Sequence, residues 1–324
     1  MKKNRMLIVD SQQMVINQLK AQFPEYDVDE ANNGRMALKM ILEEKPDIIL
    51  LDTTIPGIDG YTVLSIVKSS PETRFIPVIL TAAIAGIEDQ TKARERGADG
   101  FLVKPFNLML LQSKIKNLLQ IKALHDELSK AQQMLISLVQ ALEAKDEYAV
   151  GHSQRIAGYA VRLARKELLQ PFWQEEIRTA ALLHDIGKVG IKESIFQKPA
   201  KLTDEEYAIV KTHPAAGEKI CAVLTNLAPV LPFIRHHHER FDGGGYPDGL
   251  IGTAIPLGAR ILAVADAYDA LTSRRPYREA YSPDETVGIL REHAGSQWDP
   301  QLVELFCQMV ESGTLHSEEE NKKT

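Results

Sequence analysis

The first third of the chain alternates short apolar runs with segments of helical periodicity. A strand buried on both faces of a parallel sheet appears as an uninterrupted apolar run, whereas an amphipathic helix repeats apolar residues every three or four positions. Apolar runs predict strands at 6–9, 48–51, 78–80 and 101–103, and helical patterns cover 15–23, 34–44, 60–69 and 88–97. This alternation predicts an α/β, doubly wound parallel sheet, whose ligands bind where the strands end.

A polar side chain follows each of these predicted strands. The four residues are Asp10, Asp52, Thr81 and Lys104. One such residue alone would most simply mark the exit of a strand. Four together, of types that can hold a phosphoryl group or a cation, favour a binding site at this edge of the sheet.

The segment between Pro105 and residue 145 contains no Gly or Pro and carries a heptad. Its apolar positions, spaced alternately by three and four residues, are Ile121, Leu124, Leu128, Ala131, Leu135, Leu138 and Leu142. Such an a/d seam over about three heptads predicts a coiled-coil-like helix and, through it, a homodimer. The alternative is an amphipathic helix that packs on its own domain.

The second half of the chain has helical periodicity and few strand signals. Apolar residues that share a helix face, such as Ile156, Ala160 and Leu163, predict an all-α domain. All nine histidines lie after residue 124, and the candidate metal ligands are His152, His184, Asp185, His213, the run His236, His237 and His238, and Asp266. A lone histidine is more often a core or surface group, but this many with acids on separate helices favour a metal centre for Zn, Fe, Mn or Ni.

The adjacent pair His184-Asp185 indicates the chemistry of such a centre. Neighbours on a helix point about 100° apart, so both side chains reach one cluster only beside the flank of the helix. The aspartate could then bridge two metals with its two oxygens. Two metals about 3.5–4 Å apart can generate a hydroxide nucleophile between them and polarise a phosphoryl oxygen, which suits phosphodiester hydrolysis.

Composition limits the location and the class of the protein. A length of 324 residues with 44% hydrophobic and 25% charged residues fits two globular domains, and a net charge of −6 excludes a general DNA-coating role. Two cysteines cannot form a disulfide framework and fit a reducing cytosol. No apolar run approaches the ~20 residues of a membrane span, and no signal peptide is evident. We therefore expect a cytoplasmic protein.

Residues 5–120 resemble a response-regulator receiver domain, through the motifs LIVD, DIILLDTTIPGIDG, LTAA and FLVKPF. The resemblance implies a flavodoxin-like fold, a sensor histidine kinase as partner, and Asp52 as the phospho-acceptor. It places Thr81 and Lys104 at the phosphoryl group and makes Phe101 the aromatic switch residue. A carboxylate nucleophile with a nearby cation agrees with the chemistry of phosphoryl transfer.

One position departs from the receiver pattern. The family has two adjacent acids after the first strand, where this chain has Asp10-Ser11. A serine hydroxyl is a poor replacement for a charged Mg²⁺ ligand. Magnesium binding at the receiver is therefore doubtful, and two interpretations stay open: Asp52 accepts phosphate weakly, or the domain acts unphosphorylated as a dimerisation module.

Four stretches of residues 140–312 form a further pattern: KDEYAVGHSQRIA, LLHDIGKVGI, THPAAGEKI and HHHERFDGGGYPDGLIGTAIPLGARILAVADAYDALTSRRPYR. Through them this part of the chain resembles an HD-GYP domain, a phosphodiesterase of the HD superfamily that hydrolyses cyclic di-GMP. The ligands that the resemblance implies are His152, His184, Asp185, His213, His237, His238 and Asp266, with Asp185 bridging the metals. Some members hold a third metal through a glutamate four residues before the first histidine. Because Tyr148 stands there, we expect two divalent transition metals (Fe, Mn, Ni or Zn).

The same resemblance assigns further roles. Lys188 of the HDxGK motif would stabilise charge on the scissile phosphate or protonate the leaving oxygen. Arg275 and Arg278 match positions that contact the substrate phosphates. The loop with Gly245, Tyr246 and Pro247 is associated with substrate access and with GGDEF-domain partners. His236 is expected to support the site, and His125, His293 and His316 to lie at the surface.

These observations predict a response regulator in which the receiver controls hydrolysis of cyclic di-GMP to pGpG, and possibly on to GMP, by a metal-bridging hydroxide. The expected organisation is a receiver domain (1–120), a helical linker (121–145), an HD-GYP domain (146–316) and a disordered tail (317–324). Two alternatives are a cyclic di-GMP sensor or scaffold with little turnover, and a hydrolase of another cyclic dinucleotide. DNA binding is not expected, since the chain has no helix-turn-helix pattern and no basic stripe.

Overall fold

The computed structural model describes residues 3–70, 72–84, 86–105, 107–145, 150–196, 198, 201–274 and 279–315. The chain divides into two compact units, Met1–Glu127 and Leu128–Thr324, and each is described by itself below. No helix in the described ranges combines the length and the hydropathy needed to cross a membrane.

The first unit contains a five-stranded sheet in the order β2-β1-β3-β4-β5, and all its neighbouring strands are parallel. Its elements are β1 (Arg5–Val9), α1 (Gln13–Gln22), β2 (Asp27–Ala31), α2 (Gly34–Glu44), β3 (Ile48–Asp52), α3 (Gly60–Ser69), β4 (Val78–Ala82), α4 (Ile87–Glu95), β5 (Gly100–Val103) and α5 (Leu108–Glu143). The predicted doubly wound sheet is confirmed. In β3 and β4 every residue is buried, because helices cover both faces.

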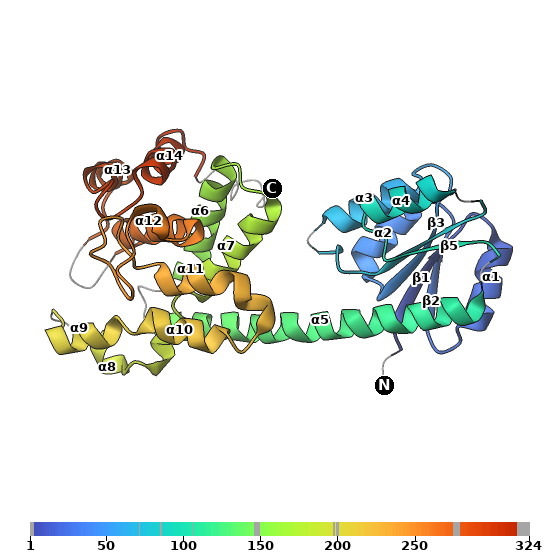
Figure 1. Ribbon diagram of the computed structural model, residues 1–324, viewed down its shortest axis with the longest axis horizontal. Helices are drawn as coiled ribbons and strands as arrows, with labels where there is room; N and C mark the ends of the chain where they lie inside the picture. The colour runs from blue at the N-terminus through green and yellow to red at the C-terminus, as the bar shows by residue number, and fades with distance from the viewer. Residues whose placement is uncertain are drawn as a thin grey trace. The chain divides into compact units, whose positions relative to one another are not determined.

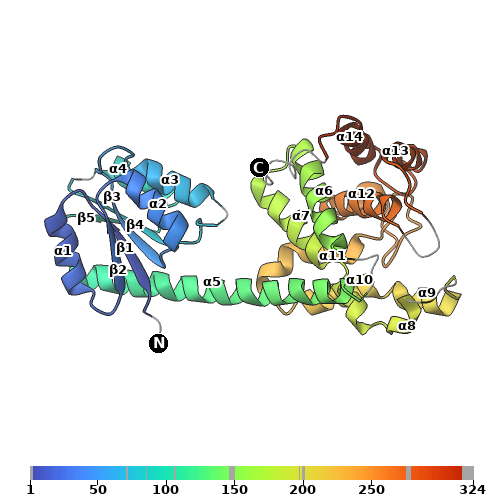
Figure 2. The same cartoon turned by 180° about the vertical axis from the view of Figure 1, so that it is seen from behind.

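The alternation of side chains along the strands separates two hydrophobic layers. Alternate residues of β1, β3 and β4 pack with α2, α3 and α4 on one face, and the intervening residues pack with α1 and the start of α5 on the other. Figures 1 and 2 show this sheet from its two sides. Because these neighbouring strands are parallel, the carboxyl ends of β1, β3, β4 and β5 lie at one edge of the sheet.

Strand β2 was not anticipated from the sequence. It lies at the edge of the sheet and consists of Asp27-Val28-Asp29-Glu30-Ala31, of which only Ala31 is buried. An edge strand has one side open to solvent and needs no continuous apolar run. Because three of its five residues are acidic, the strand does not appear as an apolar run in the sequence.

Helix α5 begins in the first unit and ends in the second. Leu111 and Ile115 are fully buried beneath the sheet, while Ile136 and Val139 belong to the core of the second unit. The two ends of the helix thus pack on their own units, as one interpretation of the pattern expected. Part of the heptad seam stays outside these contacts: Ile121, Leu124 and Leu138 are 63%, 57% and 52% exposed, whereas Leu135 packs on the core of the second unit.

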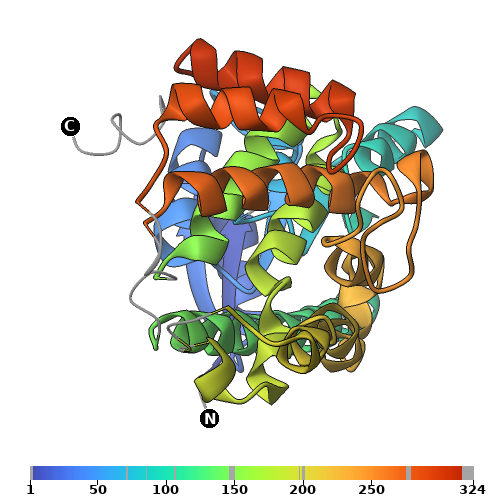
Figure 3. The same ribbon diagram turned by 90° about the vertical axis from the view of Figure 1, so that its left-hand side faces the viewer.

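The second unit contains helices and no named strand in its described ranges. They are α6 (His152–Lys166), α7 (Pro171–Leu183), η1 (Ile186–Gly190), α8 (Glu193–Phe196), α9 (Asp204–Val210), α10 (His213–Cys221), η2 (Thr225–Val230), α11 (Leu231–His236), η3 (Gly252–Ala254), α12 (Leu257–Thr272), α13 (Pro283–Glu292) and α14 (Pro300–Glu311). Figure 3 shows α13 and α14 side by side beyond α12. The predicted helical domain is confirmed. Its core surrounds α12, where the buried Tyr268 ring meets Tyr159 and Phe306 edge to face.

Candidate metal centre

The predicted ligands of the second unit converge from five helices, mostly at helix ends. His152 and His213 are the first residues of α6 and α10, His184 and Asp185 follow α7, His237 and His238 follow α11, and Asp266 lies within α12. At a helix end a side chain can leave the helix along its axis, which lets several helices supply one interior site. Of these ligands, His152, His184, Asp185, His213 and His237 are buried.

The predicted ligands form two triads on either side of Asp185. One triad is His152, His184 and Asp266, and the other is His213, His237 and His238; within each, the ligand atoms lie within 4.8 Å of one another. Oxygen Oδ2 of Asp185 is 3.3 Å from His184 Nε2, and Oδ1 is 3.3 Å from His213 Nε2. Each oxygen of this carboxylate therefore faces a different triad, as a bridging ligand requires.

The backbone fixes the orientation of three ligand rings. Each donates from Nδ1 to the carbonyl three residues earlier: His184 to Ala181 at 2.7 Å, His213 to Val210 at 2.8 Å, and His237 to Ile234 at 2.6 Å. A carbonyl oxygen only accepts, so Nδ1 carries the proton and the lone pair of a neutral ring is on Nε2. These lone pairs point into the centre.

Two features of the centre are unfavourable without a cation: a close pair of ring nitrogens and a buried oxygen without a partner. His213 Nε2 and His237 Nε2 are 3.2 Å apart, although both carry lone pairs in this tautomer. Oxygen Oδ1 of Asp185 is buried and has no hydrogen-bond partner. A buried polar atom without a partner is destabilising, and a metal ion satisfies all of these acceptors at once. The donor set therefore fits divalent metals.

The electrostatics of the centre are consistent with this interpretation. Burial lowers the pKa of His184, but the neighbouring Asp185 carboxylate outweighs burial and raises this pKa to about 9. Burial would raise the pKa of Asp185, yet His184 and Lys188 hold it well below its usual range. Burial lowers the pKa of His238 to about 4. The carboxylate thus stays ionised and attracts positive charge, which metal ions would supply.

Asp269 holds the ring of His152, the first predicted ligand, and was not anticipated from the sequence. Its carboxylate is 1% exposed, accepts from His152 Nδ1 at 2.7 Å, and binds Arg155 through Nε and Nη2 at 2.6 and 3.0 Å. Carboxylates that hold the outer nitrogen of a ligand histidine fix its tautomer and raise its basicity. The available signal was its position three residues after Asp266, which places both acids on one face of α12.

Lys188 lies directly beside the Asp185 carboxylate. Its Nζ is 2.5 Å from Asp185 Oδ2, and its side chain is 34% exposed, so the ammonium lies between the buried centre and solvent. Gly187 brings this turn against α10. A Cβ at Gly187 would lie 2.0 Å from the His213 carbonyl oxygen, so only glycine allows the approach.

The loop that contains Gly245, Tyr246 and Pro247 packs on the segment that carries His237 and His238. A Cβ at Gly245 would lie 2.2 Å from the Arg240 nitrogen. The Tyr246 ring lies 5.0 Å from that of His238, and its N–H donates to the His238 carbonyl. The buried Glu239, which sequence reasoning also missed, accepts backbone N–H bonds from three loop residues: Asp248, Gly249 and Leu250.

Other predicted residues lie elsewhere. His236 bonds Asp248 and the Pro232 carbonyl, away from the two triads. His125 stacks on Phe75 in the first unit, with ring centroids 3.8 Å apart. His293 lies 6.2 Å from the Trp298 ring. Four residues of the sequence interpretation, Arg275, Arg278, Tyr148 and His316, and the tail 317–324 lie outside the described residues.

The polar residues of the first unit also come together. Lys104 bonds Asp10 at 2.5 Å and makes a short contact with Asp52, and all three lie at the carboxyl edge of the sheet. Burial lowers the pKa of Lys104, but the two carboxylates outweigh burial and raise it. Buried Thr81 is in register with Asp52 on the neighbouring strand. Ser11, by contrast, is exposed, and Phe101 of β5 is half-buried.

Comparison with known proteins agrees with both units. The family model for the response regulator receiver domain matches residues 6–116, and that for the HD domain matches residues 137–302. The cyclic di-GMP phosphodiesterase response regulator RpfG of Xanthomonas campestris pv. campestris is 36% identical over 306 residues, covering 87% of this chain and 80% of its own length.

Two further relatives were found. A cyclic di-GMP phosphodiesterase of Thermotoga maritima is 32% identical, covering 88% of this chain and 84% of its own length. The 3′3′-cGAMP-specific phosphodiesterase 3 of Vibrio cholerae is 39% identical over 160 residues, covering 49% of this chain and 35% of its own length. The HD domain implies divalent metal binding, in agreement with the histidine and aspartate clusters. The chain belongs to the response regulators that combine a receiver domain with an HD-GYP domain of the cyclic di-GMP phosphodiesterase family.

Proposed function

We propose that this protein is a metal-dependent phosphodiesterase that hydrolyses cyclic di-GMP to pGpG under the control of its receiver domain. The observation that carries the proposal is the pair of triads separated by Asp185, with one carboxylate oxygen toward each. His152, His184 and Asp266 would hold one divalent metal, and the second triad the other. Two ions of Fe, Mn, Ni or Zn would lower the pKa of water and polarise a phosphoryl oxygen.

The chain's own residues would complete the site. Lys188, beside the bridging carboxylate, is placed to stabilise charge on the scissile phosphate or to protonate the leaving oxygen. Asp269 keeps the His152 ring aligned. Arg275 and Arg278 would bind the substrate phosphates, because guanidinium groups match phosphate oxygens in pairs.

Hydrolysis by the purified, anaerobically metal-loaded protein tests this proposal. We expect two metals per chain, linear pGpG as the first product, and loss of both metal and turnover in Asp185→Asn. Asp284→Asn, which makes the same substitution at an exposed aspartate outside the triads, is the matched control and should keep both. Metal-dependent hydrolysis by Asp185→Asn would contradict the proposal. Tight binding of cyclic di-GMP without turnover would instead indicate a sensor.

Phosphorylation of Asp52 is the proposed input. Its support is the contact of Lys104 with both carboxylates and the register of Thr81 with Asp52. Ser11 weakens the Mg²⁺ site, so we expect slow labelling by acetyl phosphate with a high Mg²⁺ requirement. Ser11→Asp should lower that requirement, and Asp52→Ala should abolish labelling. Unchanged labelling of Asp52→Ala would contradict the assignment. A sensor histidine kinase would be the donor.

A homodimer through α5 is also proposed. Ile121, Leu124 and Leu138 present an exposed apolar seam at heptad spacing. Light scattering should give twice the chain mass at micromolar concentration, and Leu124→Glu should shift the protein toward monomer. Gln133→Glu adds the same charge at an exposed position outside the seam and should leave the dimer intact. A monomeric wild-type protein would overturn this proposal.

Two remaining expectations concern partners and location. The loop with Gly245, Tyr246 and Pro247 is only half-buried beside the centre, so it could also contact a GGDEF-domain protein. Calorimetric titration with a purified GGDEF domain tests this, and equal affinity of wild type and Tyr246→Ala would contradict it. A cytoplasmic location is supported by the two free, buried cysteines and is tested by cell fractionation.

A further inference from the structure

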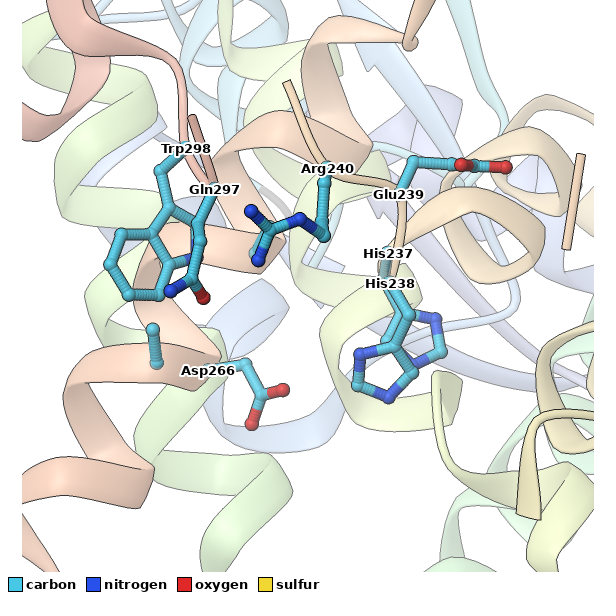
Figure 4. A pocket seen from close by; sticks show the side chains of 9 residues that line it. His237, His238, Glu239, Arg240, Asp266, Gln297 and Trp298 are labelled. Carbon is cyan, nitrogen blue, oxygen red and sulfur yellow. The ribbon is translucent and has the colours of Figure 1, made fainter. Parts of the chain in front are cut away.

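A pocket of about 180 Å³ opens beside the second triad, and the residues of its outer wall have no role in the proposed hydrolysis so far. His237, His238 and Asp266 line its inner side, and Arg240, Gln297 and Trp298 line its outer side. In Figure 4 the Arg240 guanidinium points toward the space between Asp266 and the pair Gln297 and Trp298. The pocket is therefore continuous with the metal ligands and carries a cation, an amide and an indole.

The size of the pocket fits one part of a substrate. Sites for whole ligands of drug size occupy about 300–1,000 Å³, whereas this pocket has about 180 Å³. Each phosphate of a cyclic dinucleotide joins two nucleosides. When one phosphate lies at the predicted metal ligands, a nucleoside with its base therefore lies on each side of it. One base can enter this pocket.

The outer wall is held together by backbone hydrogen bonds. Phe241 N donates to Gln297 O at 3.1 Å, and Asp242 N donates to Ser296 O at 2.9 Å. Trp298 closes a turn by accepting from Gly295 N at 2.8 Å, and its ring also packs on the core. The loops carrying Arg240 and Trp298 are thus fixed relative to each other before a ligand arrives.

The Arg240 guanidinium is held by Asp242 and keeps hydrogen-bond donors for a ligand. Asp242 holds its guanidinium from one side, with Nε–Oδ1 at 3.0 Å and Nη2–Oδ2 at 2.5 Å. Arginine has five N–H donors, so three remain for a ligand. Guanine presents two acceptors, O6 and N7, that an arginine binds in pairs, whereas adenine replaces O6 with a donor amine. The indole of Trp298 adds a surface on which any base can stack.

We infer that this pocket takes one guanine of the substrate, with Trp298 stacking on the base and Arg240 selecting guanine over adenine through O6 and N7. The inference rests on the proposed function and specifies its substrate class. One guanine pocket accepts both cyclic di-GMP and 3′3′-cGAMP, the molecules that name the relatives of this chain, and disfavours cyclic di-AMP.

Substrate competition in the metal-loaded protein is the first test. Wild type should hydrolyse cyclic di-GMP and 3′3′-cGAMP with higher kcat/KM than cyclic di-AMP. Arg240→Lys keeps the charge but loses the paired donors, so its preference for cyclic di-GMP over cyclic di-AMP should fall by about 5- to 150-fold. Arg291→Lys, at an exposed position of the same unit, should change nothing. An equal loss on all three substrates in Arg240→Lys would overturn the inference.

A second test does not depend on turnover. The chain has two tryptophans, so in a Trp173→Phe background the fluorescence reports Trp298 alone. GMP should quench this signal at a lower concentration than AMP, and Arg240→Lys should remove the difference. Equal quenching by GMP and AMP in the Trp173→Phe protein that keeps Arg240 would overturn the inference. If no dinucleotide is hydrolysed, the proposed function fails, while this titration still decides on the pocket.

Discussion

Replacing Asp269 with asparagine should weaken metal binding without any change to a ligand. In the wild type one oxygen accepts from His152 and from Arg155, and the other accepts from Arg155 alone. An asparagine has one oxygen and one NH₂ group. Whichever way the amide is turned, a donor faces a donor, either at Arg155 or at His152. If it faces His152, the proton must move to Nε2, which removes the lone pair from the centre.

The structure gives the size of both effects. Losing a hydrogen bond to a charged group costs about 1.5–3 kcal/mol, and because the Arg155 side chain is 37% exposed, water compensates part of it. We expect about 2 kcal/mol, which lowers the Tm of the second unit by about 4–8 °C. Disturbing a carboxylate behind a ligand histidine reduces metal affinity by about 10- to 100-fold.

Anaerobic calorimetric titration of chelator-stripped protein with Mn²⁺ measures the affinity, and scanning calorimetry measures the Tm. Asp299→Asn is the control, because Asp299 is a similarly buried carboxylate that pairs with Arg260 and caps α14. It should lower the Tm to a similar degree and leave Mn²⁺ affinity unchanged. Wild-type affinity in Asp269→Asn, or an equal loss in Asp299→Asn, would refute the reasoning.

Three further results are expected. Lys188→Gln should lower kcat by about 100-fold or more while metal content measured by mass spectrometry stays constant, and an unchanged kcat would remove the lysine from the mechanism. Gly187→Ala inserts a methyl group against the backbone and should lower the free energy of unfolding in denaturant by about 3 kcal/mol. The control Gly190→Ala meets no atom within 4 Å and should be nearly neutral. Equal effects of the two substitutions would contradict the packing argument. Burial raises the pKa of Cys221 and Cys307 to about 11, so little reactive thiolate is present at pH 8, and a disulfide reagent should label both only after unfolding.

The sequence predicted the elements whose side chains are apolar because they are buried. Strands β3 and β4 are enclosed on both faces and appear as apolar runs, whereas edge strand β2 has no such requirement. Helix α5 shows a further limit. Its buried residues Ile136 and Val139 each lie one position after a seam residue. One wide apolar stripe thus includes residues that pack on the core of the second unit and residues that stay exposed, and the sequence pattern alone does not separate them.

The candidate site was predictable in its ligand types but not in its supports. Histidines at long, irregular spacing have few structural explanations, so the pattern drew attention to His184 and His213. A carboxylate has many explanations, and a sequence does not distinguish one that faces a metal from one that orients a histidine or holds a loop. Asp269 and Glu239 acquire their roles only through contacts with residues 117 and 9 to 11 positions away.

The hydrogen bond at the end of α5 distinguishes the two triads of the candidate metal centre. Glu143, the last residue of α5, is 8% exposed and accepts from the backbone N–H of Ser153 at 2.7 Å. Ser153 directly follows His152, so the connector helix is joined to one ligand of the first triad. If each triad holds a metal ion as proposed, a shift of that helix would therefore change the exchange lifetime of the ion bound by His152. Exchange of bound metal against an isotope in solution would measure the difference. A fast and a slow ion should be resolved, although the two positions have similar donors.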